Sequence, residues 1–298
     1  MSGLRVSVVI PVKDDAARLR LCLDALARQT LPAGAFDVVV VDNGSADDPA
    51  AAVAAFPFAR LEREAEPGAS AARNRGVAAS RGAVIAFTDA DCLPRPEWLE
   101  AGLRRMATFP KGGLLAGRVE VMPREAGRPT ALELFDMAHA FDQRLFVEQW
   151  HFGATANVFV SRVAVESAGG FDERIPYYGE DVDFGQRIWS AGWPLAYEPG
   201  AVVRHPARRG WAGMNARLER TIRAAYGGRE ATLRRLALDL WHDWPPVRTI
   251  AGSLAHPAAG GVLGGLKLAA VTAAVRLIRL RLRLSLFWEQ RRGRRRVA

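Results

Sequence analysis

Three apolar runs in the N-terminal part of the chain each end in aspartate, and this feature strongly constrains the fold. The runs, with the acids that follow them, are 6–12 with Asp14 and Asp15, 38–41 with Asp42, and 83–87 with Asp89 and Asp91. Continuous runs rich in β-branched residues are typical of strands buried on both faces of a sheet. Stretches with helical spacing of apolar residues lie between them, so the sequence predicts an α/β fold whose mostly parallel sheet is flanked by helices.

The carboxyl ends of parallel strands meet at one edge of a sheet, and folds of this kind bind their ligands there. We therefore expect the aspartates to collect at one edge. Asp89 and Asp91 are separated by one residue, so on an extended segment their side chains point the same way and can share a cation or a ligand. Burying carboxylates without a partner is costly, which favours a bound divalent cation.

Shorter patterns predict the remaining elements. They are helices at 16–29 and 50–56, a helix before the strand at 83–87, a strand at 114–123, a helical stretch at 131–149, a strand and a helix within 154–173, a helix that begins near Asp181, and a strand at 194–205. The chain of 298 residues is long enough for one large domain and an appendage.

Charge divides the chain into two unlike parts. Residues 1–200 contain 21 Lys and Arg against 27 Asp and Glu, whereas residues 201–298 contain 20 against 5. The basic last third is therefore the part that we expect to meet an acidic partner. The two cysteines, Cys22 and Cys92, form neither a disulfide framework nor a metal-type Cys spacing, which fits a reducing cytoplasm.

The basic third is rich in Ala, Leu and Arg, and we expect it to be helical. Residues 250–275 are long and apolar enough to consider as a membrane span, but His256, Pro257, Lys267 and five glycines favour an interfacial or re-entrant segment. The arginines that follow suit the surface of an anionic membrane. Nucleic acid is not expected as a partner, because no nucleic-acid module is present and the acidic part would repel phosphates. A solvated or oligomer-forming helix pair is the alternative.

Six motifs, in order along residues 6–205, resemble those of the family 2 glycosyltransferases. They read VSVVIPVKDD, VVVVDNGSADD, EPGASAARNRG, FTDADC, GGFDE and YYGEDVDFGQR. The resemblance implies a GT-A-type catalytic domain at 1–205, with a nucleotide-binding part at about 1–115 and an acceptor-side part at about 116–205. Residues 206–298 would then form a basic helical extension associated with a membrane.

The resemblance also implies which residues meet the donor, a UDP-, GDP- or dTDP-sugar. Asp91 matches the direct ligand of Mn²⁺ or Mg²⁺, Asp89 matches a position near the ribose and the metal, and His205 matches a histidine that completes the metal shell in some relatives. The residues implied for donor binding are Pro11, Asp15, Asp42, Arg73, Asn74 and Asp89. A cation held there would offset the charge of the diphosphate as it departs.

Transfer to an acceptor hydroxyl needs a base, and one carboxylate across the cleft from the metal suffices for a reaction that inverts the anomeric centre. By resemblance Asp181 is that base, Glu180 contacts the acceptor, and Gly153, Thr155 and Asn157 lie in the acceptor-side segment. Trp150 can stack on the face of a sugar. The prediction is an inverting, metal-dependent glycosyltransferase at the cytoplasmic face of the cell membrane. Its acceptor would be a glycan or a lipid-linked precursor in surface polysaccharide synthesis.

Ordinary structural roles remain open for the same residues. Asp42 begins a common turn sequence, and Glu180 and Asp181 can complement a helix N-terminus. Arg73 can pair with a surface glutamate, and the tryptophans can belong to the core. Two other functions also remain open. One is a non-catalytic GT-A-fold binding or scaffold protein, and the other is a phosphatase of the haloacid dehalogenase type with Asp89 as its nucleophile.

Overall fold

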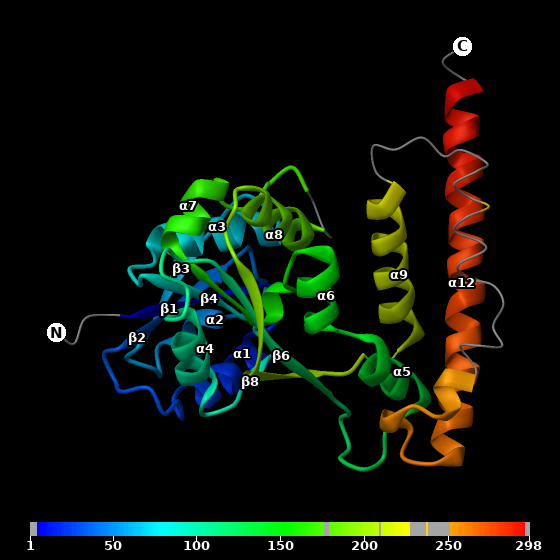
Figure 1. The fold of residues 1–298 in the computed structure, drawn as a ribbon, viewed down its shortest axis with the longest axis horizontal. Coiled ribbons are helices and arrows are strands. Elements are labelled where there is room, and N and C mark those ends of the chain that lie inside the picture. Colours follow the sequence, from blue (N-terminus) through cyan, green and yellow to red (C-terminus); the bar gives the residue numbers. More distant parts are fainter. Residues whose placement is uncertain (1–4, 176–178, 209, 227–236, 238–250, 296–298) are drawn as a thin grey trace. The chain divides into compact units, whose positions relative to one another are not determined.

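The computed structural model describes residues 5–175, 179–208, 210–226, 237 and 251–295 (Figure 1). In this part of the chain, one sheet of eight strands is flanked by helices on both faces. The strands are β1 Val6–Val12, β2 Phe36–Asp42, β3 Ala59–Arg63, β4 Val84–Phe87, β5 Leu93–Pro94, β6 Leu114–Met122, β7 Val158–Ser161 and β8 Leu195–Pro206. The helices are α1 Ala16–Leu26, α2 Pro49–Val53, α3 Ala69–Ala79, α4 Trp98–Met106, α5 Ala131–His139, α6 Gln143–Trp150, α7 Arg162–Ala168, α8 Glu180–Ser190, α9 Trp211–Tyr226 and α12 Val262–Arg295, with short 3₁₀ turns η1 Thr155–Asn157 and η2 Pro257–Ala259.

The strands lie in the order β3-β2-β1-β4-β7-β6-β8-β5. β1 pairs in parallel with β2 and β4, and β2 pairs in parallel with β3. β7 joins β4 and β6 in antiparallel pairs, and β5 pairs antiparallel with β8. The predicted α/β class is confirmed, and the parallel pairing belongs to the half of the sheet that contains β1.

Both faces of β1 are covered, which explains why its sequence is a continuous apolar run. Val8 and Ile10 pack with α1, α2 and α4 on one face, whereas Val9 packs with α7 and α8 on the other. Figure 1 shows these two groups of helices on opposite sides of the sheet. Helix α3 reaches the second face at Gly76, where a Cβ would lie only 2.3 Å from a methyl group of Val9. A larger residue would push α3 away from the strand.

Gly102 of α4 faces the fully buried ring of Phe159 on β7, and a Cβ at this position would lie 2.3 Å from the ring. We expect Gly102→Ala to lower the free energy of unfolding by about 1–3 kcal/mol, because the packed ring has no room to move. Chemical denaturation measures this change. Gly213→Ala in α9, where no described atom lies within 4 Å of the new Cβ, is the matched control. That variant should keep its stability or gain up to about 1 kcal/mol, and equal effects of the two substitutions would contradict the packing argument.

Several parts of the fold differ from the sequence prediction, which did not include β5 or α4. Strand β3 was not predicted, because its sequence ARLER is polar; it lies at the sheet edge, where Arg60 pairs with Asp37 of β2. The helical stretch predicted at 131–149 is two helices, α5 and α6. The break lies at Phe141, which has a φ of 57°, and at Asp142, whose side chain caps α6 by accepting a hydrogen bond from the backbone N–H of Leu145.

The chain divides into two compact units, one made of residues 1–120 and 141–206 and the other of residues 121–140 and 207–298. The predicted domain boundary at 205 stays a prediction, and residues 121–140 belong to the second of these units. In that unit α5, α9 and α12 share a small apolar core, and the buried carboxylate of Asp136 accepts hydrogen bonds from Arg208 and Arg217. The ion pairs hold α5 to the segment before α9 and to α9 itself.

The basic third is helical where it is described, in α9 and in α12, and the RLRLRL sequence lies within α12. The helix prediction for residues 227–236 and 238–250 falls outside the described residues. Among the helices that the structure describes, none is long and apolar enough to cross a membrane.

Candidate active site

The acid-ended strands meet at one edge of the sheet, as the sequence predicts. In the pairing register Val12 of β1 lies beside Asp42 of β2, and Val9 lies beside Phe87 of β4. The loops that follow β1 and β2 are joined by hydrogen bonds. Asp14 adopts a φ of 54°, its backbone N–H donates to the hydroxyl of Ser45, and its carboxylate accepts from a backbone N–H in the β2 loop. These hydrogen bonds therefore hold the loops after β1 and β2 in a fixed position at the carboxyl ends of the strands.

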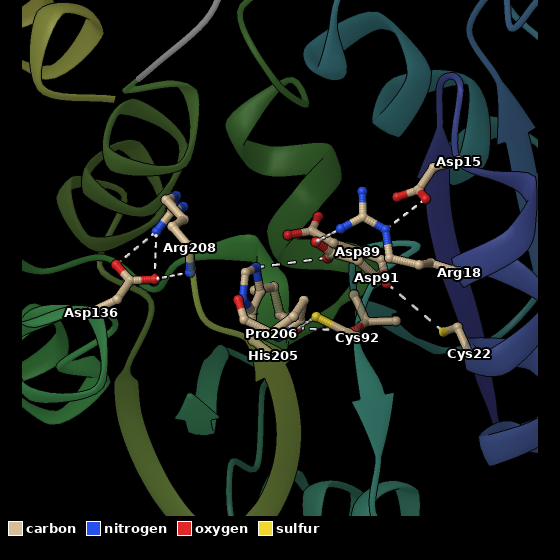
Figure 2. A network of polar contacts seen from close by, with 12 residues as sticks. Asp15, Arg18, Cys22, Asp89, Asp91, Cys92, Asp136, His205, Pro206 and Arg208 are labelled. Atoms are coloured by element: carbon tan, nitrogen blue, oxygen red, sulfur yellow. Dashed lines mark hydrogen bonds and ion pairs between the residues drawn. The ribbon is translucent and has the colours of Figure 1, made fainter. Parts of the chain in front are cut away.

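Four potential metal ligands lie together at this edge: Asp89, Asp91, Cys92 and His205. Their ligand atoms all lie within 4.8 Å of one another. Three of the residues come from the turn after β4, which is held by a hydrogen bond of 3.1 Å from the N–H of Cys92 to the carbonyl of Asp89. His205 comes from the end of β8, far away in the sequence. Figure 2 shows the imidazole facing the Asp91 carboxylate.

The orientation of His205 fits metal binding. Its Nδ1 lies 2.8 Å from the carbonyl oxygen of Pro206, so Nδ1 carries the proton and donates it to this hydrogen bond. The lone pair of Nε2 is then free to point at the site, where Nε2 lies 3.7 Å from Oδ1 of Asp91. A backbone partner for the second ring nitrogen is the usual way in which a ligating histidine is fixed. The residues present therefore suit a divalent cation.

Arg18 was not predicted as a site residue, although it lies one helical turn after Asp15. Figure 2 shows its guanidinium between Asp15 and Asp91: Nε lies 2.7 Å from Asp15, and a terminal nitrogen lies 3.4 Å from Asp91. Burial raises the pKa of Asp91 above its usual range, His205 and Arg18 counteract this rise, and Asp89 adds to it. The Arg18 side chain is 54% exposed, so it can move away from Asp91 at little cost when a cation binds.

Arg73 links two groups of residues that were predicted separately, Asp89 on the predicted donor side and Glu180 on the predicted acceptor side. Its side chain is only 6% exposed, with one terminal nitrogen 3.5 Å from Asp89 and the other 3.1 Å from Glu180. The alternative of a surface ion pair for Arg73 does not hold, and it is the neighbouring Arg75 that pairs with Glu62. The buried Nε of Arg73 has no hydrogen-bond partner among the described atoms, so one strong donor is available for a ligand.

Asp181 lies in the first turn of α8, next to Glu180, as predicted. Desolvation and the charge of Glu180 raise the pKa of Asp181 to about 7, against the opposing effects of Arg73 and of the backbone N–H of Val182. A carboxyl group that titrates near neutral pH can accept a proton more readily than an ordinary aspartate. The structure thus brings together Asp89, Arg73, Glu180 and Asp181 in one network.

Asp42 lies beside a hollow of about 340 Å³ at the same edge of the sheet. Its Oδ1 accepts a hydrogen bond of 2.9 Å from the backbone N–H of Ser45, which is the turn geometry that the sequence left open. The hollow is lined by Asp42, Ser45, Asp47, Asp48, Pro49, Ala50, Leu61 and Arg63. The turn is compatible with a ligand contact, because the turn uses only Oδ1 of Asp42 and its Oδ2 can accept a hydrogen bond from a ligand. Pro11 lies next to Val41, one residue before the end of β1.

Three other predicted site residues have clear structural roles. The amide of Asn74 bonds to the backbone of Phe171 in both directions and to Glu173, and so holds the loop between α7 and α8. Gly153 packs closely, since a Cβ there would lie 2.9 Å from Ala116. Trp150 is 49% exposed at the end of α6, and its carbonyl accepts a hydrogen bond from Gln186 of α8. Their roles toward donor or acceptor stay predictions.

Comparison with known proteins identifies the family. Residues 7–169 match the model of "Glycosyl transferase family 2". The chain is 35% identical over 210 residues to "Glycosyltransferase AglE" of Haloferax volcanii, covering 68% of this chain and 67% of that protein. It is also 34% identical over 216 residues to "Succinoglycan biosynthesis protein ExoO" of Rhizobium meliloti, covering 68% of this chain and 61% of that protein. The chain thus spans about two thirds of the length of these relatives.

A solved structure has the same fold. It is "Mannosyltransferase PcManGT from Pyrobaculum calidifontis in complex with GDP-Man and Mn2+", which superposes with a TM-score of 0.63 at 20% identity and covers 96% of this chain and 87% of that one. The predicted GT-A-type fold, with a helical C-terminal part, is confirmed. The chain therefore belongs to glycosyl transferase family 2 and is a glycosyltransferase.

Proposed function

We propose that this glycosyltransferase is metal-dependent and inverting, and that it transfers a sugar from a nucleotide-diphosphate donor to a glycan or lipid-linked acceptor in cell-surface polysaccharide synthesis. The observation that carries the proposal is the position of Arg73, which contacts both Asp89 and Glu180. The predicted metal and donor side and the predicted base side are therefore parts of one site. The names of the relatives and the GDP-Man and Mn²⁺ of the structural neighbour agree with this function.

In the proposed mechanism, Asp91, Asp89 and His205 would hold Mn²⁺ or Mg²⁺, and the bound cation would supply positive charge to stabilise the departing diphosphate. Nε of Arg73 donates a hydrogen bond to a phosphate oxygen. Asp181 accepts the proton of the acceptor hydroxyl as its oxygen attacks the anomeric carbon from the side opposite the leaving group. The new bond to the acceptor oxygen forms as the bond to the diphosphate breaks, so the anomeric configuration inverts. Asp89, the nucleophile in the phosphatase alternative, pairs with Arg73. Membership of a glycosyltransferase family favours sugar transfer over the phosphatase and scaffold alternatives.

A panel of donors tests the proposal. The thermal stability of the protein is measured with UDP-, GDP- and dTDP-sugars, each with and without Mn²⁺, and the product of the donor that binds is examined by NMR. Stabilisation by one donor only in the presence of the cation, followed by a product of inverted configuration, is the expected result. A product of retained configuration, or transfer at an unchanged rate in excess chelator, would contradict the mechanism.

The second unit offers a surface for the anionic membrane that we propose as its partner, at the cytoplasmic face of the cell membrane. Residues 251–266 contain no Asp, Glu, Lys or Arg, and they comprise a helical turn at 251–254, η2 and the first residues of α12, with Leu254 against Gly265. Val262 and Leu263 are 78% and 69% exposed. An uncharged segment with exposed apolar side chains, followed by a basic helix, suits insertion into the headgroup region of a bilayer.

We expect the double substitution Val262→Asp and Leu263→Asp to weaken binding to vesicles of anionic lipid by at least about tenfold, because each side chain would lose about 1.5–3 kcal/mol of burial. Co-sedimentation with the vesicles measures the binding. Leu21→Asp is the control, because Leu21 is 54% exposed on α1 of the first unit. Equal binding of the two variants would place the contact elsewhere, and a change of oligomeric state without loss of vesicle binding would show that the surface joins copies of the chain.

A further inference from the structure

Cys92 places a sulfur atom beside the oxygen and nitrogen ligands of the proposed cation site. Its thiol lies within 4.8 Å of the ligand atoms of Asp89, Asp91 and His205. The side chain is fully buried, and Figure 2 shows the sulfur on the side that faces His205. No sequence spacing indicated this arrangement, because Cys92 follows β4 whereas His205 lies at the end of β8, more than 100 residues later.

We propose that Cys92 is a sulfur ligand of this site, which therefore binds thiophilic divalent cations such as Zn²⁺ and Co²⁺ through Asp91, Cys92 and His205, in competition with Mn²⁺ or Mg²⁺. This inference rests on the proposed cation site. Binding breaks the S–H bond of Cys92 and forms a bond from sulfur to the cation, and the released proton goes to solvent.

The distances agree with a mixed site. In a tetrahedral zinc site with bonds of about 2.0–2.3 Å, neighbouring ligand atoms lie about 3.5 Å apart. Nε2 of His205 and Oδ1 of Asp91 are already 3.7 Å apart, and the other ligand atoms lie no more than 4.8 Å from one another, so a pair at that limit would have to approach by about 1.3 Å. The hydrogen bond from His205 Nδ1 to the carbonyl of Pro206 holds the ring in the tautomer that such a cation requires.

The present partner of the thiol is weak enough to be given up. Sγ of Cys92 lies 3.9 Å from the carbonyl oxygen of Ala156, at the long end of the range for a sulfur donor. A thiolate ligand favours soft or borderline cations, whereas oxygen ligands alone favour Mg²⁺ and Mn²⁺. Replacing the sulfur with oxygen should therefore change which cations bind well while leaving the oxygen ligands in place.

Cys22 provides a matched control, because the chain contains only these two cysteines. It is also fully buried at the same edge, but its thiol lies 3.8 Å from the backbone carbonyl of Asp89 and it is not among the four clustered ligands. Any effect that depends merely on a buried thiol near the aspartates should appear in both variants.

The experiment is a titration of the full chain with Co²⁺, followed by absorption spectroscopy. We expect a sulfur-to-cobalt charge-transfer band in the near ultraviolet for the native protein and for Cys22→Ser, and its loss in Cys92→Ser. Competition titrations should show that Cys92→Ser weakens Zn²⁺ binding by at least about tenfold and changes Mn²⁺ binding by less than about twofold. Cys92→Ala serves as a second variant, and circular dichroism confirms that each variant is folded.

Bound Co²⁺ without the charge-transfer band in the native protein would overturn the inference, as would a band that persists in Cys92→Ser. The failure of the proposed function has a different signature, since sugar transfer that is independent of Mn²⁺ and Mg²⁺ contradicts that function whatever the cobalt spectrum shows. If the charge-transfer band appears but sugar transfer does not depend on a cation, sulfur ligation by Cys92 would be supported, whereas a role of the cation in catalysis would not.

Discussion

Replacing Asp91 with alanine is expected to lower kcat/KM for sugar transfer by at least about 10³-fold, or about 4 kcal/mol in the transition state. Asp91 is one of the four clustered ligands, and its carboxylate lies 3.7 Å from Nε2 of His205 and 3.4 Å from a terminal nitrogen of Arg18. Without its carboxylate the site keeps too few anionic ligands to hold a divalent cation against the departing diphosphate. Steady-state kinetics over a range of Mn²⁺ and Mg²⁺ concentrations measure the effect.

The control for this variant is Asp24→Ala, on the exposed side of α1, where Asp24 pairs with Arg20. It should keep the activity and the cation dependence of the native protein. The Asp91 variant should also lose the stabilisation that the donor confers only in the presence of the cation. Near-native transfer by Asp91→Ala, with an unchanged cation dependence, would remove Asp91 from the metal site.

The gathering of acidic residues at the carboxyl ends of the strands could be predicted from the sequence for a physical reason. Apolar runs that are buried on both faces identify the central parallel strands, and parallel strands bring their carboxyl ends to one edge. The positions of Asp42, Asp89 and Asp91 follow from these two rules alone. Strand β3 escaped prediction because an edge strand is half-exposed and needs no apolar pattern, as its sequence ARLER shows.

Contacts between distant segments could not be predicted in this way. Cys92 and His205 meet because β8 returns to the sheet beside β5, and nothing in the local sequence of either residue indicates the other. The surface position considered as an alternative for Arg73 followed from its neighbours in the sequence, whereas in the structure Arg73 is buried, its guanidinium lies over the ring of Phe171, and it pairs with Glu180. The pairing partners of charged residues depend on the tertiary fold, so local sequence patterns cannot predict them.

The Arg73 network also has a consequence for the order of events at the site. Its guanidinium contacts Asp89 on the proposed donor side and Glu180 on the proposed acceptor side, so a negative diphosphate that draws Arg73 toward itself would loosen the contact with Glu180. Since Arg73 lowers the pKa of Asp181 and Glu180 raises it, the position of one arginine affects the proton affinity of the predicted base. In the proposed mechanism, Arg73 would thereby connect donor binding to activation of the acceptor.

Asp181→Asn is the second substitution with a large expected effect, a fall in kcat of about 10²–10⁴-fold through loss of the base. Asparagine keeps the size of the side chain but cannot accept the hydroxyl proton, so donor binding and its stabilising effect should be preserved. Asp183→Asn is the matched control, because Asp183 lies two residues further along α8 and pairs with Arg187. It should remain close to native in activity.

The pH dependence gives an independent measurement of the same role. With a pKa of about 7, Asp181 is protonated and inactive as a base at lower pH, so kcat/KM of the native protein should rise with pH and reach half of its maximum near pH 7. The rise should be absent from the remaining activity of Asp181→Asn and present in Asp183→Asn. A pH profile that is the same in Asp181→Asn and in the native protein, or a loss of less than about tenfold in kcat, would show that another group takes the proton.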